Sequence, residues 1–479
     1  MARAKIEFLL KEDIDKINRK SLEVLSKIGV KIQSGSTIEL LEKAGATRSS
    51  DGKRILIGEE MVKAALSSSP KSILLAALDR QLDIKIPTKG KIYAATGGTG
   101  AYIKNLFTGE IRTSTANDLR DIAIISDEMS EIDYFWPLVS PMDQPIEIKG
   151  VIELEMSFAF TRKHVQGESM TGDEARKMIE LASMLVGGEE ALTKRPIFSC
   201  VQCPISPLTF EKGLVEAQVE LSKAGIPVVA MTASLAGLTS PITIAGTLVQ
   251  LNAENLASLV ISQTARKGAP FIYSSDSSPA NLHTGGIDYQ AMESPLIRTA
   301  AAQMGKYYNL PTMSAVCSIE NVSLTMRSIS EGIPLLLHEC LIPSDLASGI
   351  GGIDDSSGGS FEQTVVDAWI WDATVSFARN FEFDDESIAL DTIREAAMDG
   401  SYLNKRHTMM RFKKELCSVQ NGEAHIGWME DDGDTPGMLL KEAKLEVERI
   451  LKARKNKPWM PNSDFLRIEE FVRNAKENV

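Results

Sequence analysis

Side chains capable of chemistry stand at the ends of the predicted strands rather than in one compact motif. The sequence has no Ser-His-Asp order, no HExxH helix and no closely spaced carboxylate pair of the glycosidase kind. It therefore does not indicate a hydrolase. Aromatic, amide and single carboxylate side chains dominate the set, which consists of Trp136, Glu168, Gln202, Cys203, Thr232, Tyr273, Asp276, Cys317, Glu320, His338, Glu339 and Cys340.

Cys200 and Cys203 form a CxxC spacing, which occurs in redox sites and in one half of a zinc site. His338 and Cys340 are chemically able to supply the remaining zinc ligands. Side chains alternate between the two faces of a strand, so Cys200 and Cys203 are expected to point in opposite directions. We therefore expect small buried thiols and predict no metal. His338 is either a core histidine bonded to backbone or a substrate contact.

Glycine-rich stretches fall in predicted loops at 97–100, 285–286 and 349–359. No basic residue accompanies them, and neither GxGxxG nor a Walker sequence follows a predicted strand. They are more typical of turns or of a loop over a site than of a phosphate cradle. Ser360 is expected to cap the helix that starts at Phe361.

Short apolar segments alternate with helical stretches, as in βα units of a parallel sheet. Two predicted helices end in the same way. A glycine stops the helix and a proline two residues later begins the strand, at Gly225 with Pro227 and at Gly268 with Pro270. The predicted helices cover 115–129, 172–186, 210–224, 252–267, 295–308 and 361–377. The predicted strands cover 92–96, 132–139, 164–168, 197–203, 227–232, 270–274, 312–316 and 334–339. Eight strands without a nucleotide loop favour an α/β fold of the (β/α)8 TIM barrel type.

The strand count divides the chain into three stretches. Residues 1–75 are expected to form an N-terminal helical extension, 76–384 the (β/α)8 barrel, and 385–479 a C-terminal appendage packed on the barrel. The appendage contains Trp428 and Trp459. Barrels commonly pair, so the sequence is compatible with a homo-oligomer.

Composition excludes several classes of protein. The 479 residues are 43% hydrophobic and 24% charged, which are globular values. A net charge of −13 disfavours binding to nucleic acid or to an anionic membrane surface. No run of apolar residues reaches the length of a membrane span, and the five cysteines are too few and odd in number for a disulfide framework. We expect a cytoplasmic protein with reduced thiols.

A series of segments, taken together, resembles the trimethylamine methyltransferase family. The resemblance runs from the N-terminal helix to the C-terminal region, and it implies a (β/α)8 barrel that moves a methyl group from an amine to Co(I) of a separate, cognate corrinoid protein. The corrinoid would be supplied by that partner and not held tightly by this chain. The segments are Gly97-Gly-Thr99, Thr108-Gly-Glu-Ile-Arg112, Pro204-Ile-Ser-Pro-Leu208, Leu235 to Gly246, Asn252-Ala-Glu254, Lys267-Gly-Ala-Pro270, Asn309-Leu-Pro311, and His407-Thr408 with Trp428.

The sequence departs from the pyrrolysine-bearing members of that family. Near the seventh strand it reads from Cys317 to Met326 with standard residues only. This resembles the non-pyrrolysine branch, which implies a small quaternary amine such as glycine betaine, proline betaine, carnitine or γ-butyrobetaine. Methyl transfer from a quaternary nitrogen releases a neutral amine, so it needs neither a general acid nor a nucleophilic side chain.

Such a substrate requires an aromatic cage for its cation. We predict that Tyr102, Trp136, Tyr273 and Phe361 contribute to this cage, although ordinary packing is an alternative for each ring. A betaine carboxylate needs donors, for which His338, Gln202 and loop amides are the candidates.

Two other functions are compatible with the same residues. One is a zinc-dependent corrinoid methyltransferase of the methanol type, which would use the thiols and His338. The other is a non-catalytic protein that binds a betaine.

Overall fold

The computed structural model describes residues 6–88, 90–289, 291–315, 341–342, 344–378, 382–415, 435–455 and 457–477. Seven parallel strands form the central sheet, in the spatial order β6-β17-β16-β14-β12-β10-β9. Their bounds are β6 Tyr93–Thr96, β9 Val165–Glu168, β10 Phe198–Gln202, β12 Val228–Thr232, β14 Phe271–Ser275, β16 Thr312–Ala315 and β17 Leu346–Ile350.

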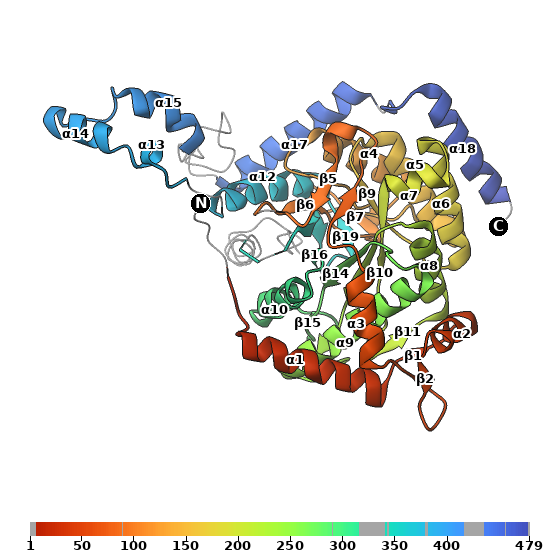
Figure 1. Ribbon diagram of the computed structural model, residues 1–479. Coiled ribbons are helices and arrows are strands. Elements are labelled where there is room, and N and C mark those ends of the chain that lie inside the picture. Colours follow the sequence, from red (N-terminus) through yellow and green to blue (C-terminus); the bar gives the residue numbers. More distant parts are fainter. Residues whose placement is uncertain are drawn as a thin grey trace.

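The segment between β6 and β9 closes the sheet into a barrel. Tyr134 forms a parallel bridge with Ala95 of β6, and Phe135 forms one with Val165 of β9. This segment falls within the predicted strand 132–139 and acts as the second of eight strands. The predicted (β/α)8 barrel is therefore confirmed, and Figure 1 shows the strands surrounded by helices.

The last strand differs from the sequence prediction. The predicted strand 334–339 lies outside the described residues, and the place between β16 and β6 belongs to β17. The sequence of β17, Leu-Ala-Ser-Gly-Ile, contains glycine and one β-branched residue, so it carries little strand propensity. Pairing on both sides, with an irregular register between Ser348 and Ile350, makes it a strand.

The outer helices follow the predicted alternation. Two predicted ranges, 172–186 and 361–377, match the observed helices, and Ser360 caps the second by accepting a hydrogen bond from the Gln363 amide. Glycine ends α8 at Gly225 in the left-handed conformation, as predicted. The barrel helices are α4 Ala116–Glu128, α5 Lys149–Phe160, α6 Gly172–Val186, α7 Glu189–Lys194, α8 Lys212–Ala224, α9 Ile244–Ala265, α10 Glu293–Tyr307 and α12 Phe361–Phe377.

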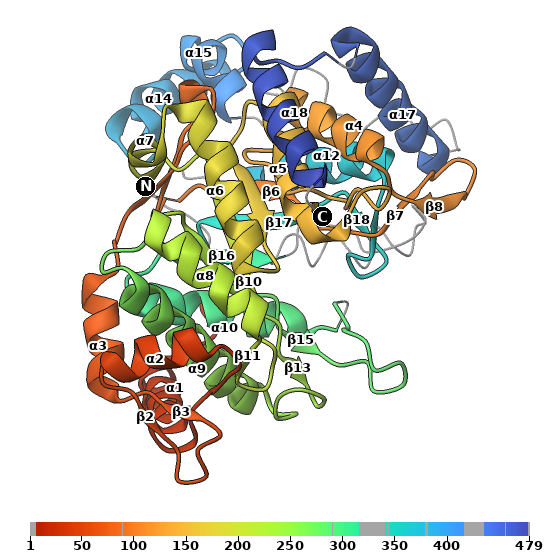
Figure 2. The same cartoon turned by 90° about the vertical axis from the view of Figure 1, so that its right-hand side faces the viewer.

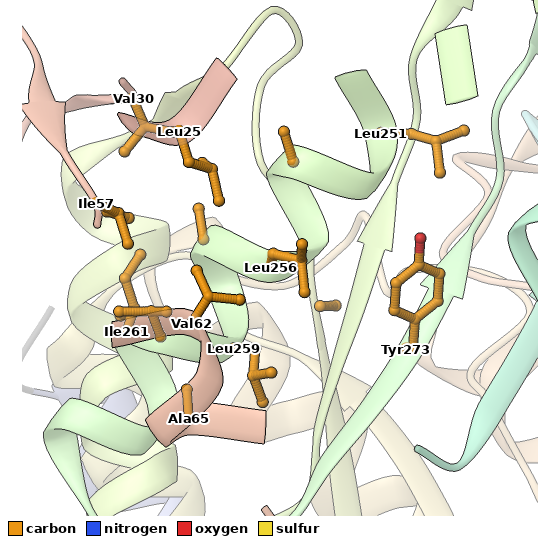
Figure 3. Packing of buried hydrophobic residues seen from close by; sticks show 14 of the residues in the cluster. Leu25, Val30, Ile57, Val62, Ala65, Leu251, Leu256, Leu259, Ile261 and Tyr273 are labelled. Atoms are coloured by element: carbon orange, nitrogen blue, oxygen red, sulfur yellow. The ribbon is translucent and has the colours of Figure 1, made fainter. Parts of the chain in front are cut away.

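The N-terminal helices pack on α9. Figure 3 shows apolar side chains of α9 filling the space between the N-terminal segment and Tyr273 of β14. α9 is long and apolar enough to span a bilayer, but 72% of that window is buried in the protein, as in a core helix. The N-terminal elements are α1 Lys11–Glu23, η1 Val24–Ile28, β1 Lys31–Ile32, α2 Gly35–Lys43, β2 Thr47–Arg48, β3 Ile55–Leu56 and α3 Glu59–Ser68.

An antiparallel hairpin fills one end of the barrel interior. Its strands are β4 Ile73–Leu75 and β5 Ile84–Ile86, separated by η2 Arg80–Leu82. Their isoleucine and leucine side chains pack with inward residues of the barrel, including Tyr134 and Val229. The N-terminal end of the barrel is therefore closed by side chains, which leaves the carboxyl end of the strands for a site.

Short strands and loops stand at that carboxyl end, and helices cover the side of the barrel. α17 packs against α4 and α12, and α18 against α5 and α6. The indole N–H of Trp459 donates to the Phe158 carbonyl at 2.9 Å, whereas Trp428 lies outside the described residues. The remaining elements are β7 Tyr102–Lys104, β8 Ile111–Thr113, η3 Ile146–Ile148, β11 Thr209–Phe210, β13 Leu235–Ala236, β15 Ser278–Pro279, β18 Gly352–Ile353, β19 Gly358–Gly359, α13 Asp385–Ile388, α14 Leu390–Asp399, α15 Arg406–Glu415, α17 Thr435–Arg454 and α18 Asn462–Glu477.

Candidate active site

A cavity of about 330 Å³ lies at the carboxyl ends of the barrel strands. That volume is near the lower end of the range for ligand sites, so it suits a small molecule. All eight strands contribute to its wall, directly or through the loop that follows. Its lining residues are Gly97, Gly98, Trp136, Glu168, Ser169, Met170, Val201, Cys203, Leu214, Met231, Asp276, Tyr289, Ala315, Ser348, Gly349 and Ser356.

Trp136 forms an aromatic wall of the cavity. The Thr96 hydroxyl donates to the Trp136 carbonyl and accepts from its amide at 3.2 Å, which fixes the backbone beneath the ring. A Cβ atom on Gly98 would lie 2.4 Å from Cζ2 of the indole. The glycine is therefore required for the ring to occupy this position.

Glu168 is the last residue of β9 and carries one of two carboxylates in the cavity wall. The Thr99 hydroxyl donates to both of its oxygens, at 3.2 and 3.3 Å, from a residue with a left-handed φ of 49°. Burial raises the pKa of Glu168, while Lys149, Thr99 and Trp136 act in the opposite direction. These neighbours favour the ionised form inside a site of low polarity.

Asp276 carries the second carboxylate. The Tyr289 hydroxyl donates to its Oδ2 at 2.5 Å, and Nη2 of Arg298 lies 3.9 Å from its Oδ1. The Arg298 guanidinium also lies 5.2 Å from the Tyr289 ring centroid and is only 2% exposed. Burial raises the pKa of Asp276, whereas Arg298 and the Tyr289 hydroxyl lower it. Oδ1 is buried and has no hydrogen-bond partner among the described residues.

Two further buried acidic residues, Glu174 and Glu153, do not line the cavity themselves. Glu174 accepts hydrogen bonds from the amides of Gly150 and Met170, both at 2.7 Å, and so joins α5 to the loop after β9. Glu153 is 1% exposed and lies 3.8 Å from the Lys149 ammonium. Burial raises the pKa of Glu153 to about 8, so this carboxyl is mostly protonated at neutral pH.

Comparison with known proteins identifies the family. The family model described as Trimethylamine methyltransferase (MTTB) matches residues 2–479. The chain belongs to the trimethylamine methyltransferase family. Its sequence is 29% identical over 407 residues to a trimethylamine methyltransferase of Desulfitobacterium hafniense strain DCB-2, covering 85% of this chain and 82% of the relative. It is 23% identical over 445 residues to a glycine betaine methyltransferase of Desulfitobacterium hafniense strain Y51, covering 90% of each chain.

A solved structure supports the fold of this methyltransferase. The monomethylamine methyltransferase of Methanosarcina barkeri superposes with a TM-score of 0.50 at 12% identity, covering 92% of this chain and 94% of that one. The resemblance to the family that the sequence motifs indicated is thus confirmed, together with the enzyme class. The chain is a methyltransferase with a (β/α)8 barrel.

The structure of the methyltransferase places one of the predicted cage residues, Trp136, in the cavity wall. Tyr102 does not line the cavity. Its hydroxyl donates to Asp354, which lies in the same loop as the lining residue Ser356. Asp354, Asp355 and Ser356 all have left-handed φ values, of 51°, 53° and 60°, so this loop stores backbone strain beside the site. Tyr102 thus supports the wall without lining it.

Three other predicted site residues do not line the cavity, and a fourth lies outside the described residues. Tyr273 packs on the outer face of β14, with its hydroxyl donating to Asn252 of α9 at 3.0 Å. Gln202 also faces outward and donates to the Ser169 carbonyl at 3.1 Å. Phe361, at the start of α12, packs against the cluster of outer helices. His338 lies outside the described residues.

Strand parity explains the first two corrections. On β14, Ile272 points into the barrel and Tyr273 points out, and on β10 Val201 points in and Gln202 out. A residue at a strand end lines the cavity only if its side chain points into the barrel. Packing against neighbouring strands and helices decides which side chains point inward. The sequence prediction judged these two residues by position and residue type alone.

Sequence reasoning missed three groups in the wall. Glu168 and Asp276 stand at strand ends but were not included in the predicted cage, and Tyr289 lies in the loop that follows β15. Residue type was a reason to include the two carboxylates, because a negative charge stabilises a bound cation. Tyr289 carries no comparable signal, because a loop aromatic reaches the cavity only through the fold.

The predicted opposite orientation of the two cysteines is confirmed. Cys200 packs in the outer cluster and Cys203 lines the cavity, and both are free thiols. Within the part of the chain that the structure describes, no three His, Cys, Asp or Glu side chains gather where they could hold a metal ion. Cys317 and Cys340 lie outside that part.

Burial of Glu153 predicts a pH-dependent stability. Its folded-state pKa of about 8 exceeds the unfolded value of 4.5, so the associated stability is complete below pH 4.5 and is lost as pH rises through 8. Glu153→Gln is expected to remove this loss, worth roughly 3 to 5 kcal/mol at alkaline pH. Urea unfolding at pH 5 and pH 9 measures it.

The matched control is Glu39→Gln, at a side chain that is 71% exposed. We expect this control to follow the wild type at both pH values. A Glu153→Gln effect of equal size at pH 5 and pH 9 would contradict the assignment of a raised pKa.

Proposed function

We propose that this methyltransferase moves a methyl group from a small quaternary ammonium compound to Co(I) of a corrinoid carried by a separate, cognate protein. The observation that carries the proposal is the composition of the cavity wall. Two carboxylates, Glu168 and Asp276, stand in it with two aromatic side chains, Trp136 and Tyr289. Carboxylates and aromatic faces both attract an organic cation.

The protein's task in this reaction is to bind and orient. The carbon–nitrogen bond breaks with its electron pair left on nitrogen, and the methyl carbon bonds to the electron pair of Co(I). The amine departs neutral, so the side chains need not donate a proton. Holding the methyl group in line with its acceptor is worth several kcal/mol by itself. Met170, Leu214 and Met231 supply apolar surface that keeps water from the cation.

The position of the cavity suits an acceptor on another protein. It lies at the carboxyl ends of the strands, and the opposite end is filled by the β4–β5 hairpin. An acceptor therefore approaches from the barrel mouth. The proposal includes the cytoplasmic location predicted from composition. The two described cysteines, both free thiols, are compatible with a reducing compartment.

The charges in the wall affect how well a quaternary amine with a carboxylate would bind. Among the described lining residues none is Lys, Arg or His, so a betaine carboxylate would rely on backbone amides near Gly97, Gly98 and Gly349. A cation without a carboxylate is attracted by Glu168 and Asp276 and has no negative group for them to repel. One relative is named for glycine betaine, a quaternary amine with a carboxylate, and another for trimethylamine, a tertiary amine.

The decisive experiment supplies chemically reduced cobalamin and follows conversion of its Co(I) absorbance to the methylated form. The panel contains glycine betaine, proline betaine, carnitine, γ-butyrobetaine, choline, tetramethylammonium, trimethylamine and methanol. We expect methyl transfer from at least one quaternary compound and none from trimethylamine.

Three outcomes would contradict the proposal. Transfer from trimethylamine alone would indicate a methylamine substrate. Transfer from methanol that stops on treatment with a chelator would favour zinc chemistry. Tight binding of a quaternary amine without transfer, to free cobalamin or to the corrinoid partner, would indicate a binding protein.

A further inference from the structure

Three neighbouring loops on one side of the barrel mouth carry no charged side chain. They cover 204–210 after β10, 233–243 after β12 and 277–287 after β14, and none of these residues is Asp, Glu, Lys or Arg. In the whole chain 24% of the residues are charged, and charged residues normally stand at the surface. None of the residues in these loops lines the cavity, so binding of a small amine does not explain their composition.

Pairing and hydrogen bonds hold the three loops together. β13 in the second loop pairs in parallel with β15 in the third, and Figure 2 shows the two strands next to each other, right of centre. Ser206 of the first loop and Ser234 of the second both donate to the buried Glu254 carboxylate, at 2.8 and 3.1 Å. The three loops therefore form one surface of defined shape, which we name the mouth rim.

Each loop of the mouth rim exposes at least one large apolar side chain. Ile205, Leu238, Ile242 and Leu282 are 50, 55, 65 and 67% exposed. Ile242 and Leu282 come from different loops and meet above Gly237, where a Cβ atom would lie 2.8 Å from Cδ1 of the first and 3.4 Å from Cδ2 of the second. Apolar side chains that gather on a surface without charge are typical of an interaction site.

The mouth rim borders the cavity. Cys203 and Asp276 line the cavity, and each directly precedes one of the loops. The cavity volume of about 330 Å³ suits a small amine and is too small for a corrin macrocycle. When cobalt meets a methyl group in the cavity, the macrocycle therefore stays outside, and its edge extends over the surrounding loops.

We infer that the mouth rim seats one edge of the corrin macrocycle that accepts the methyl group. This inference rests on the proposed function, because transfer to cobalt is what brings a corrin to the mouth. The edge of a corrin carries methyl groups and uncharged amide arms. Ile205, Leu238, Ile242 and Leu282 offer apolar contact to the methyl groups. A charged rim would lose its hydration against these neutral groups, a cost that charge-free loops avoid.

The composition of the mouth rim favours a corrin over the protein that carries it. The periphery of an interface between two proteins is normally polar and accessible to water, and charged side chains are common there. The charge-free loops differ from that pattern, although the chain as a whole has a net charge of −13. A neutral macrocycle needs no opposite charge on its seat.

Equilibrium dialysis of the full chain with dicyanocobinamide tests the inference. This corrin has no nucleotide tail and no net charge. We expect the wild type to bind it, and Leu282→Asp and Leu282→Lys each to weaken binding by at least about 10-fold, because either charge must be desolvated against the ring. Ile242→Asp is expected to act in the same way. The matched control is Leu445→Asp on α17, at the side of the barrel, because Leu445 is 64% exposed and Leu282 is 67% exposed. We expect the control to bind like the wild type.

Choline affinity and the melting temperature are measured in the same variants and are expected to stay unchanged, because neither Ile242 nor Leu282 lines the cavity. A wild type that does not bind the corrin, or rim variants that bind it as tightly as the wild type, would overturn the inference. Opposite effects of Leu282→Asp and Leu282→Lys would also overturn it, since they would indicate a charged partner.

Methyl transfer to free Co(I) cobalamin is a separate readout that reports on the proposed function. Absence of transfer from every quaternary amine would contradict the proposed function. Corrin binding that the rim variants still weaken would in that case support the seat on the mouth rim.

Discussion

Replacing Glu168 with glutamine is expected to lower the affinity of the cavity for an organic cation by about 30- to 100-fold. A carboxylate beside a cation in a dry site contributes about 2 to 3 kcal/mol, and glutamine keeps the shape but removes the charge. Asp276→Asn is expected to have a smaller effect, because Arg298 at 3.9 Å already compensates part of that charge.

A pair of ligands separates charge from shape in this test. Choline and its uncharged carbon isostere, 3,3-dimethylbutan-1-ol, occupy nearly the same volume. Calorimetry gives the ratio of the affinity for choline to the affinity for the uncharged isostere. Loss of packing weakens both ligands alike and leaves this ratio unchanged. We expect this ratio to fall in Glu168→Gln and to stay at the wild-type value in Glu254→Gln. Glu254 is also a buried carboxylate whose pKa is raised by burial, but it does not line the cavity.

The same interaction predicts a pH dependence. Burial raises the pKa of Glu168, and only the ionised form attracts a permanent cation. Affinity for choline should therefore fall as pH decreases through this raised pKa, at a higher pH than for an ordinary carboxyl group. The uncharged isostere should show no such fall. A choline profile in Glu168→Gln identical to that of the wild type would remove Glu168 from the site.

The Gly98→Ala variant is expected to lose about 100-fold in methyl transfer without loss of the fold. The added Cβ would lie 2.4 Å from Cζ2 of Trp136, so the indole must leave its position. Displacement of a positioning group by about 1 Å is able to cost 10² in rate. The expected signature is a fall in kcat/KM with a changed tryptophan fluorescence and an unchanged melting temperature.

Two further variants test the cause of that loss. Gly35→Ala is the matched control, because a Cβ atom at Gly35 meets nothing within 4 Å. Trp136→Phe in the Gly98→Ala background makes room for the methyl group and should restore part of the activity. Equal losses in Gly98→Ala and Gly35→Ala, or no recovery with the smaller ring, would show that Trp136 is not the affected group.

Local patterns in the sequence predicted most of the fold. Helix boundaries at 172–186 and 361–377 were readable because capping residues and glycine stops act within a few residues. Seven of the strand positions were readable because buried parallel strands are short apolar runs between turns. β17 was not readable, since its five residues become a strand only through β16 and β6 on either side.

The candidate site was predictable only in part. Trp136 was found because an aromatic residue at a strand end is conspicuous, whereas Tyr273 and Gln202 were placed inward although the fold turns them outward. Nothing local distinguishes the two parities when both faces of a strand are buried.

The sequence by itself determined the fold class, the family and the absence of acid and base motifs, because these depend on short-range patterns and on residue types. Only the tertiary structure decided which strand-end residues meet in one cavity. Glu168 and Asp276 are 108 residues apart in the chain, and closure of the barrel brings both into one wall. Register and closure are set by contacts between distant strands and helices, which no local pattern encodes.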